Sequence, residues 1–250
     1  MGAESKLQRD HQFEADIVPA IGAAAGGWKE LTASERQADL RADSIRHFWS
    51  GCAKRAFDLV VASVLLVLNA PLFLVVSIIV RSDGGPAFFS QERVGRDGRR
   101  FACYKFRTMV VDAEGRLDRL LAENPEARAE WNATQKFKND PRVTRWGLWL
   151  RRTSIDELPQ LLNVIMGDMS LVGPRPIPTP ELAHYGPEIL VYIRERPGIT
   201  GLWQVNGRNN LDYQARIALN SRYVMHRTLY GDIKILAKTA WIVLGGKGAY

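Results

Sequence analysis

LVVASVLLVLNAPLFLVVSIIV, residues 59–80, is a run of 22 residues without a charged side chain. A straight helix of this length rises about 33 Å, enough to cross the ~30 Å hydrocarbon core of a bilayer. Pro71 interrupts the middle of the run, two positions after Asn69. Proline removes a helix hydrogen bond, so it kinks or ends a helix there. The freed backbone groups need partners from side chains such as Asn69 or Ser63, because lipid supplies none.

Basic residues flank both ends of this run. Lys54 and Arg55 precede it, and residues 81–107, which follow it, hold seven basic and three acidic side chains. Positive flanks favour the cytoplasmic side, so a bent helix that enters and leaves by that face suits both ends. A straight single-span anchor is the alternative, and the residues alone leave both open.

The composition bounds the remaining classes. With 250 residues, 46% hydrophobic and 24% charged, the chain is neither wholly disordered, collagen-like nor polytopic. Two cysteines, Cys52 and Cys103, are too few for a disulfide framework or a thiolate metal site, which indicates a reducing compartment. The four histidines show no metal-ligand spacing. The net charge of +7 suits anionic lipid or a phosphorylated substrate more than nucleic acid, because the basic cluster adjoins the apolar run.

These patterns predict three parts and an α+β, mainly helical fold. Residues 1–51 form a polar arm with a short amphipathic helix near Ser44, residues 52–81 the membrane helix, and residues 82–250 a cytosolic domain. No signal peptide is expected, because the first twenty residues lack an apolar core.

Within the cytosolic domain, Asp97-Gly98 predicts a β-hairpin of residues 87–94 and 100–107. Hydrophobic periodicity predicts further helices, some of them amphipathic and suited to a membrane interface or a protein core. They are expected over residues 112–130, just before Arg151, from Ser154 to Gly167, and around residues 233–241. Residues 173–176, Gly-Pro-Arg-Pro, predict a constrained non-helical loop.

Asp156 and Glu157 lie in the most informative stretch, residues 153–157. The structural interpretation is a capping box, in which Ser154 begins a helix and Glu157 reaches back to it. The functional interpretation starts from a carboxylate that stays ionised at a helix N-terminus, where free N–H groups can also hold a phosphate. Aspartate is a competent nucleophile toward phosphorus, and a neighbouring glutamate can hold Mg²⁺.

Cations surround this pair and suggest a pyrophosphate site. Pro174 and Pro176 stiffen the loop that carries one of them, and two others alternate onto one face of a hairpin strand. The sequence has no phosphate-binding glycine-rich loop and no Asp-x-Asp pair. The cations are Lys105, Arg107, Arg151, Arg152 and Arg175.

Five segments together resemble the bacterial sugar transferase family, the monotopic polyprenol-phosphate phosphoglycosyl transferases. The likeness runs from about Cys52 to Tyr250. The segments are KRAFD (54–58), YKFRTM (104–109), RRTSIDELPQ (151–160), MSLVGPRP (169–176) and PGITGLWQVNGR (197–208).

The resemblance implies an enzyme of the bacterial inner membrane, monotopic on the cytoplasmic face, of the compact group that consists of the catalytic core. It would transfer a hexose-1-phosphate, from UDP-galactose or UDP-glucose, to undecaprenyl phosphate through a covalent aspartyl-phosphosugar intermediate, and so initiate exopolysaccharide or O-antigen synthesis. Its partners would be these substrates and inner-membrane lipid, without nucleic acid, and a homodimer is left open.

Carried over by motif, Asp156 is the nucleophile, Glu157 a Mg²⁺ ligand and Arg175 a nucleotide contact. Arg151, Lys105 and Arg107 are candidate phosphate contacts. The family's membrane helix is re-entrant and broken at a proline, which here points to Asn69 and Pro71.

Two other classes of protein account for fewer of these sequence features. A non-enzymatic, basic membrane-surface binding protein explains the charge and the apolar run, but not the acidic pair beside arginine-rich loops. A glycosidase is a poorer fit, because adjacent helical carboxylates point about 100° apart instead of flanking a bond.

Overall fold

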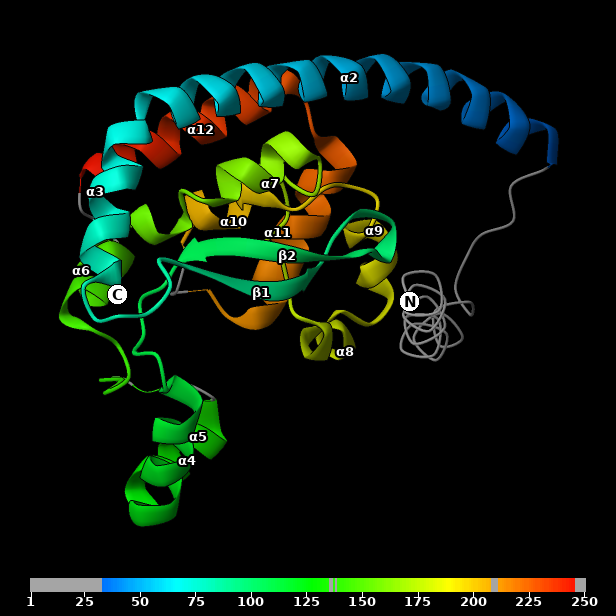
Figure 1. The fold of residues 1–250 in the computed structure, drawn as a ribbon. Helices are drawn as coiled ribbons and strands as arrows, with labels where there is room; N and C mark the ends of the chain where they lie inside the picture. Colours follow the sequence, from blue (N-terminus) through cyan, green and yellow to red (C-terminus); the bar gives the residue numbers. More distant parts are fainter. Residues whose placement is uncertain (1–32, 135–136, 138, 208–210, 246–250) are drawn as a thin grey trace, which may run out of the picture.

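The computed structural model describes residues 33–134, 137, 139–207 and 211–245, and its fold is mainly helical (Figure 1). The first helices and strands are α2 (Ala33–Leu68), α3 (Ala70–Arg81), β1 (Phe88–Val94), β2 (Arg100–Phe106), α4 (Ala113–Glu123), α5 (Pro125–Thr134) and α6 (Arg145–Thr153). They are followed by α7 (Gln160–Met166), β3 (Ser170–Val172), α8 (Leu182–Tyr185), α9 (Ile189–Tyr192), β4 (Gly198–Thr200), α10 (Leu202–Val205), α11 (Tyr213–His226) and α12 (Leu229–Leu244).

The apolar run folds into two helices that meet at Asn69. Pro71 lies in the first turn of α3, and the Asn69 side-chain amide donates at 2.8 Å to the Leu65 carbonyl, which also accepts from the Asn69 N–H at 3.0 Å. The break therefore lies where the sequence predicts it, whereas this contact does not partner a backbone group freed by Pro71. In the described part of the chain no single helix is long and apolar enough to cross a membrane. Residues 51–68 and 70–81 meet the length and hydropathy criteria only as a pair bent by 61°.

Helix α2 is longer than predicted. It begins at Ala33 and continues through residues 51 and 52, so the short helix expected near Ser44 is part of one long helix. Figure 1 shows α2 arching over the domain with α12 beneath it. The remainder of the predicted arm, residues 1–32, lies outside the described residues.

The predicted β-hairpin is confirmed. Strands β1 and β2 pair antiparallel, with Gln91 opposite Cys103. The turn is a short 3-10 segment in which Asp97 and Gly98 both have positive φ, +55° and +72°. An aspartate followed by a glycine adopts this left-handed backbone at low cost, which explains the turn.

A second strand pair was not predicted. β3 and β4 run parallel, with Ser170 opposite Gly198 and Val172 opposite Thr200. Each strand has three residues, too few for an alternating pattern to stand out in the sequence. The pair belongs to the largest apolar core, whose buried members are Ala62, Cys103, Leu161, Val164, Met169, Leu171, Val172, Tyr223, Val224 and Ile235.

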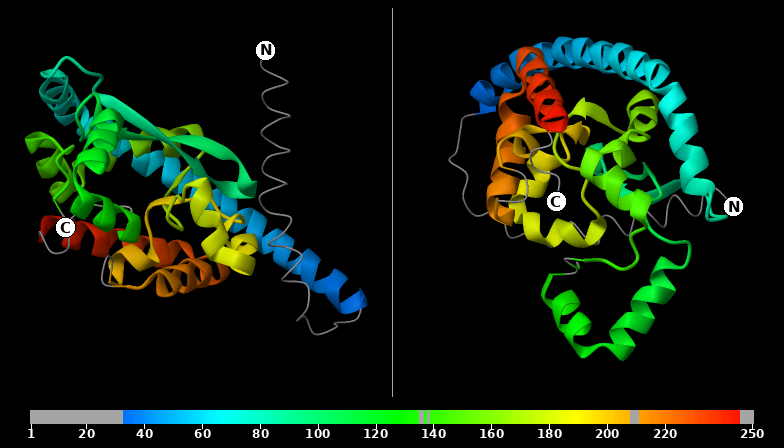
Figure 2. Two further views of the ribbon diagram at one scale, coloured as in Figure 1. Left: turned by 90° about the horizontal axis from the view of Figure 1, so that it is seen from below. Right: turned by 90° about the vertical axis from the view of Figure 1, so that its left-hand side faces the viewer.

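The prediction of one continuous helix over residues 112–130 is wrong, because the structure has two helices there. The predicted helix divides at Asn124 into α4 and α5, because Pro125 cannot supply the next backbone N–H. The two helices project from the rest of the molecule (Figures 1 and 2), and α4 buries no residue. At the base of this projection the Arg142 guanidinium lies over the rings of Trp131 and Phe137.

Helix α12 forms as predicted. It packs through Asp232 and Ile235. Ile233 and Trp241, both on the predicted apolar face, are exposed. Leu236 of the same face packs against the largest core, so only part of the predicted apolar face is turned toward the core.

Candidate active site

Asp156 lies in a 3-10 turn, Ile155–Glu157, between α6 and α7. Ser154 has a left-handed backbone, φ +59°, ends α6 and makes no capping hydrogen bond with its side chain toward this turn. The predicted capping box is therefore wrong: Ser154 stops one helix instead of starting the next. The turn that carries Asp156 thus begins directly after α6, and α7 begins at Gln160.

Helix α6 approaches the end of the hairpin at Gly147. A Cβ atom on Gly147 would lie 2.0 Å from the Thr108 carbonyl oxygen, so only glycine permits this contact. The Thr144 hydroxyl caps the helix by accepting from the Gly147 N–H at 2.9 Å. One turn before Asp156, the Arg151 Nε donates to the Thr108 hydroxyl at 2.9 Å. The approach thus fixes Arg151 beside the turn that holds Asp156.

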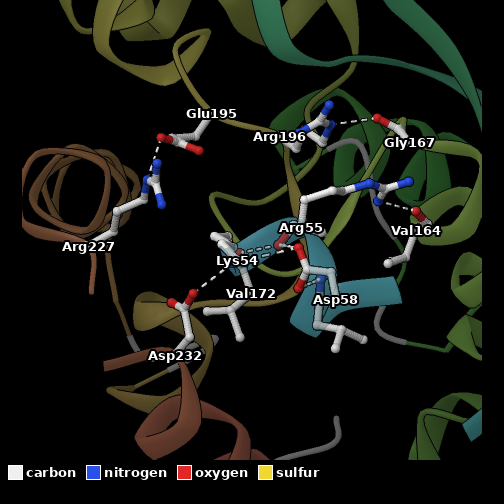
Figure 3. Close-up of polar contacts among 12 residues, drawn as sticks. Lys54, Arg55, Asp58, Val164, Gly167, Val172, Glu195, Arg196, Arg227 and Asp232 are labelled. Atoms are coloured by element: carbon white, nitrogen blue, oxygen red, sulfur yellow. Dashed lines mark hydrogen bonds and ion pairs between the residues drawn. The ribbon is translucent and has the colours of Figure 1, made fainter. Parts of the chain in front are cut away.

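Helix α7 is held at its other end by two arginines (Figure 3). Arg55 of α2 donates to the carbonyls of Val164 and Ile165, at 2.6 and 3.0 Å, and Arg196 Nε donates to that of Gly167 at 2.7 Å. These carbonyls lie at the end of α7, where the Val164 carbonyl also accepts from the Gly167 N–H at 3.2 Å, and positive charge is favourable at a helix C-terminus. The contacts tie α2 to the short helix that follows the acidic pair.

Asp156 is buried, with 8% of its surface exposed. Burial, and secondly the charge of Glu157, raise the pKa of Asp156 to about 6, against the opposing effect of Lys105 and Arg151. The sequence predicts a carboxylate that stays ionised at a helix start. This prediction is wrong in degree, because the pKa of Asp156 lies well above that of a free aspartate. Above pH 6 the group is mainly charged, but the folded protein holds that charge at a cost.

Lys105 Nζ lies 2.6 Å from Glu157 Oε1. Burial opposes the charge of this lysine, yet Glu157 and Asp156 together raise the pKa of Lys105, so it remains a cation. The acidic pair and Lys105 form a compact charged group at the open edge of the hairpin.

Arg93, Cys103 and Lys105 share one face of the hairpin, because their cross-strand register differs by two positions at each step. Burial raises the pKa of the Cys103 thiol, while Lys105 and Arg93 act against this shift. Arg175 exerts a smaller effect on the same thiol. Burial, and then the charge of Arg175, lower the pKa of Arg93. The register places Arg93 on the side of Cys103 away from Lys105, and the charge of Arg175 acts on Arg93 there.

Arg175 projects from the Gly-Pro-Arg-Pro loop, between the buried Pro174 and the partly buried Pro176. Its guanidinium carbon lies 5.5 Å from the centre of the Trp203 ring. Within the described part of the chain, this guanidinium has no hydrogen-bond or ion-pair partner. A cation without a carboxylate partner is suited to an anionic ligand.

Two predicted contacts are not brought to the acidic pair. Arg107 binds the Asp83 carboxylate with both terminal nitrogens and also donates to the carbonyls of Val80, Pro86 and Met109. β2 ends at Phe106, so Arg107 lies outside the strand. Its side chain therefore binds the loop that follows α3 and not the acidic pair. Arg152 is exposed and has no hydrogen-bond or ion-pair partner among the described residues.

Comparison with known proteins decides the classification. The profile of the family described as Bacterial sugar transferase matches residues 49–246.

The chain belongs to the bacterial sugar transferase family.

Three relatives in this family are between 38% and 52% identical to the chain over about 200 aligned residues. An undecaprenyl-phosphate galactose phosphotransferase of Salmonella typhimurium is 52% identical over 197 residues, which are 79% of this chain and 41% of that protein. The exopolysaccharide production protein ExoY of Rhizobium meliloti is 48% identical over 201 residues, 80% of this chain and 89% of ExoY. A UDP-glucose:undecaprenyl-phosphate glucose-1-phosphate transferase of Escherichia coli is 38% identical over 206 residues, 79% of this chain and 41% of that enzyme. The chain thus spans about two fifths of the Salmonella and Escherichia proteins, and most of ExoY.

Asp156 and Glu157 can be compared with the ligands that Mg²⁺ takes beside a phosphorylated substrate. No group of three or more His, Cys, Asp or Glu side chains that could hold a metal occurs among the described residues. Mg²⁺ commonly binds one or two carboxylates and completes its coordination with water and phosphate oxygens. Glu157, whose side chain is 38% exposed, and the adjacent Asp156 supply that number of carboxylates.

Sequence analysis missed two residues of the site. In the sequence, Arg93 is one of the seven basic residues of the range 81–107, with nothing to single it out. The hairpin register places it on the same face as Lys105. The Asp97-Gly98 turn fixes that register, so alternation from it could have identified Arg93. Trp203, whose ring the Arg175 guanidinium covers, lies in the segment 197–208 that resembles the family. No local pattern in that segment indicates which loop the Trp203 ring faces.

Proposed function

We propose that the chain is a membrane-bound transferase that moves a hexose-1-phosphate from a UDP-hexose to undecaprenyl phosphate, and so initiates a surface polysaccharide. The names of the Salmonella and Escherichia relatives describe such transfers of galactose and glucose. ExoY, most of whose length the chain covers, is named for exopolysaccharide production. The observation that carries the proposal is the buried Asp156 carboxylate in the turn between α6 and α7, where the charges of Lys105 and Arg151 act on it.

In the first step an Asp156 oxygen attacks the phosphorus that bears the sugar. The bond from this phosphorus to the UMP oxygen breaks, UMP leaves, and an acyl phosphate joins Asp156 to the sugar phosphate. In the second step an oxygen of undecaprenyl phosphate attacks the same phosphorus. The acyl phosphate bond breaks, the Asp156 carboxylate is restored, and the sugar is joined to the lipid through a diphosphate. Burial favours this role, because a poorly solvated carboxylate is a stronger nucleophile.

The surrounding residues bind and orient the donor. Glu157 would hold Mg²⁺, which when bound supplies positive charge at the diphosphate. Lys105, which pairs with Glu157, and Arg151, whose charge acts on Asp156, would contact phosphate oxygens of the donor. Arg175 and its neighbour Arg93 would bind the nucleotide end.

The bent pair α2 and α3 would form a re-entrant hairpin that enters and leaves by the cytoplasmic face of the inner membrane. Apolar side chains on both helices are exposed, among them Val67 at 72% and Leu74 at 64%. Val76 and Val80 of α3 instead pack against Phe106 and Leu150 of the domain. The exposed Trp146 of α6 and Trp241 of α12 would lie at the interface, where tryptophan is favoured.

A donor panel tests the activity. Membranes containing the protein are mixed with undecaprenyl phosphate, Mg²⁺ and radiolabelled UDP-galactose, UDP-glucose or a UDP-acetamido sugar. We expect labelled lipid from one of the two hexose donors, with none from Asp156→Asn. Lipid binding without transfer from any donor would instead support the basic membrane-surface binding protein. The homodimer remains a prediction, which the mass of the detergent-solubilised protein tests.

A further inference from the structure

A buried polar group joins α2 to the centre of the domain (Figure 3). Lys54 Nζ lies 2.7 Å from an Asp232 oxygen and 3.8 Å from Asp58, and each of the three side chains is at most 8% exposed. The Tyr223 hydroxyl donates to the other Asp232 oxygen at 2.8 Å. Two members of the group reach the strand β3: the Tyr223 hydroxyl lies 2.9 Å from the Val172 carbonyl oxygen, and Asp58 contacts the two residues before Val172.

The Asp58 carboxylate holds β3 with both of its oxygens. One oxygen accepts from the Ser170 hydroxyl at 2.7 Å, and the other accepts from the Leu171 N–H at 3.2 Å. Ser170 is 1% exposed and Asp58 2%, so water does not compete for these bonds. Because two bonds run to consecutive residues, they fix the position of the strand along its own axis.

The loop that carries Arg175 follows this strand directly. Its first residue, Gly173, donates to the Thr200 carbonyl at 2.9 Å. A Cβ atom on Gly198 would lie 2.0 Å from the Gly173 nitrogen, so the backbones of the two segments are in direct contact. A shift of β3 is therefore passed to the loop with little room for adjustment.

The far end of the same loop is anchored separately. The Tyr192 hydroxyl lies 3.0 Å from the Arg175 carbonyl oxygen, and Val94 of β1 donates to the Ile177 carbonyl at 2.9 Å. With this end fixed on the hairpin, displacement at the β3 end would rotate the segment between them. The Arg175 side chain, which no hydrogen bond to a described residue restrains, would move with it.

We propose that Asp58 is a positioning residue for Arg175: through Ser170 and Leu171 it sets β3, and β3 sets the donor-binding loop. The proposal rests on the proposed function, in which Arg175 contacts the nucleotide. Asp58 immediately precedes the apolar run of α2, so the helix that would enter the membrane also fixes the geometry of the donor site.

A buried ion pair is a weak source of net stability, because desolvation offsets the attraction between its charges. Asp58→Asn changes these contacts with almost no change in volume, because asparagine presents one acceptor and one NH₂ donor. With its oxygen on the Leu171 N–H, its NH₂ group would face the Ser170 hydroxyl and the Lys54 ammonium, which lies 3.8 Å from the oxygen that it replaces. The Ser170 hydroxyl would then turn its proton to the Val172 carbonyl, 2.9 Å away, and the negative charge beside Lys54 would be lost.

The test measures UDP-sugar affinity by calorimetry in the Asp156→Asn background, which removes turnover, with UDP-galactose and UDP-glucose as probes. We expect both Asp58→Asn and Arg175→Lys to weaken binding by about 5–10-fold, a size typical of coupled residues. The deciding result is the combination. If Asp58 acts through Arg175, adding Asp58→Asn to Arg175→Lys should weaken binding less than about twofold.

Asp118→Asn is the matched control, because Asp118 is exposed and has no hydrogen-bond or ion-pair partner among the described residues. Ser170→Ala removes one of the two bonds and keeps the Asp58 charge. Ser170→Ala should also weaken UDP-sugar binding, by a smaller factor than Asp58→Asn. If Asp58→Asn does not fold, Ser170→Ala takes its place in the combination with Arg175→Lys.

Fully additive effects of Asp58→Asn and Arg175→Lys, or unchanged affinity in a folded Asp58→Asn protein, would overturn the proposal. If Arg175→Lys itself left the affinity unchanged, the donor site of the proposed function would be wrong, and this inference with it. If Arg175→Lys weakens binding and Asp58→Asn does not, only the positioning role fails.

Discussion

Asp156→Asn should make the metal-free, substrate-free protein more stable while abolishing its activity. The pKa of Asp156 is raised from 3.8 to about 6, chiefly by burial. A difference of about two pH units corresponds to about 3 kcal/mol. Above pH 6 the folded and unfolded proteins both carry the charge, so the folded state bears this whole cost. Below pH 3.8 both are protonated and the cost disappears.

The asparagine amide brings a cost of its own. Lys105 and Arg151 are donors and cannot accept from its NH₂ group, and a buried donor without a partner costs about 1–3 kcal/mol. We therefore expect a net gain of up to about 2 kcal/mol at neutral pH, or a Tm increase of up to about 8 °C in a domain of this size.

The assay is thermal unfolding in detergent with EDTA, at several pH values between neutral and about pH 4. The gain should be largest above pH 6 and should shrink as the pH falls toward 3.8. Asp118→Asn, at an exposed carboxylate, should show neither effect. Lower stability of Asp156→Asn at neutral pH, or a gain that does not depend on pH, would refute the argument that burial destabilises this carboxylate.

Three further perturbations address other parts of the structure. Glu157→Gln should lower activity mainly by weakening Mg²⁺ binding, so a Mg²⁺ titration should shift to higher concentration; an unchanged midpoint would count against Glu157 as a ligand. Asp83→Asn should lower the free energy of unfolding by less than about 1 kcal/mol at neutral pH, because solvent screens this partly exposed ion pair. Since the Arg107 guanidinium holds the pKa of Asp83 at about 2, the stabilisation is complete above 3.8, and the difference from wild type should vanish as the pH falls toward 2. Replacing Asn69 and Pro71 with Leu should straighten the α2–α3 pair toward a span, so a cysteine near residue 50 should become reactive to an impermeant thiol reagent in intact cells; continued protection of that cysteine would argue that other residues set the bend.

Elements with a strong local signal could be predicted from the sequence. Asp97-Gly98 fixed the hairpin, and Asn69 with Pro71 fixed the break between α2 and α3. In each case the residues that determine the backbone conformation lie within three positions of one another, at the turn or the break itself. Tertiary context was not needed.

Ser154 shows where local reasoning fails. The spacing from Ser154 to Glu157 fits a capping box, but the residue has a left-handed backbone and ends the preceding helix. The contact of Gly147 with Thr108 sets the path of α6, and this contact spans 39 positions in the sequence. No local pattern contains that information.

The candidate site divides in the same way. Lys105 could be placed by strand alternation, whereas Arg107, two positions later on the same expected face, lies beyond the end of β2 and binds Asp83. The pKa of Asp156 could not be predicted either. It depends on burial, which the folded chain creates and a motif does not describe.

The measurement that tests the central claim most directly is the mass of the intact protein after incubation with the hexose donor and Mg²⁺ in the absence of undecaprenyl phosphate. We predict an increase equal to one hexose phosphate, located on the peptide that contains Asp156 and accompanied by an equal amount of UMP. The adduct should be absent from Asp156→Asn and should be lost when undecaprenyl phosphate is added. Release of UMP only when the lipid is present, with no adduct at any time, would show direct transfer and contradict the role of Asp156 as the nucleophile.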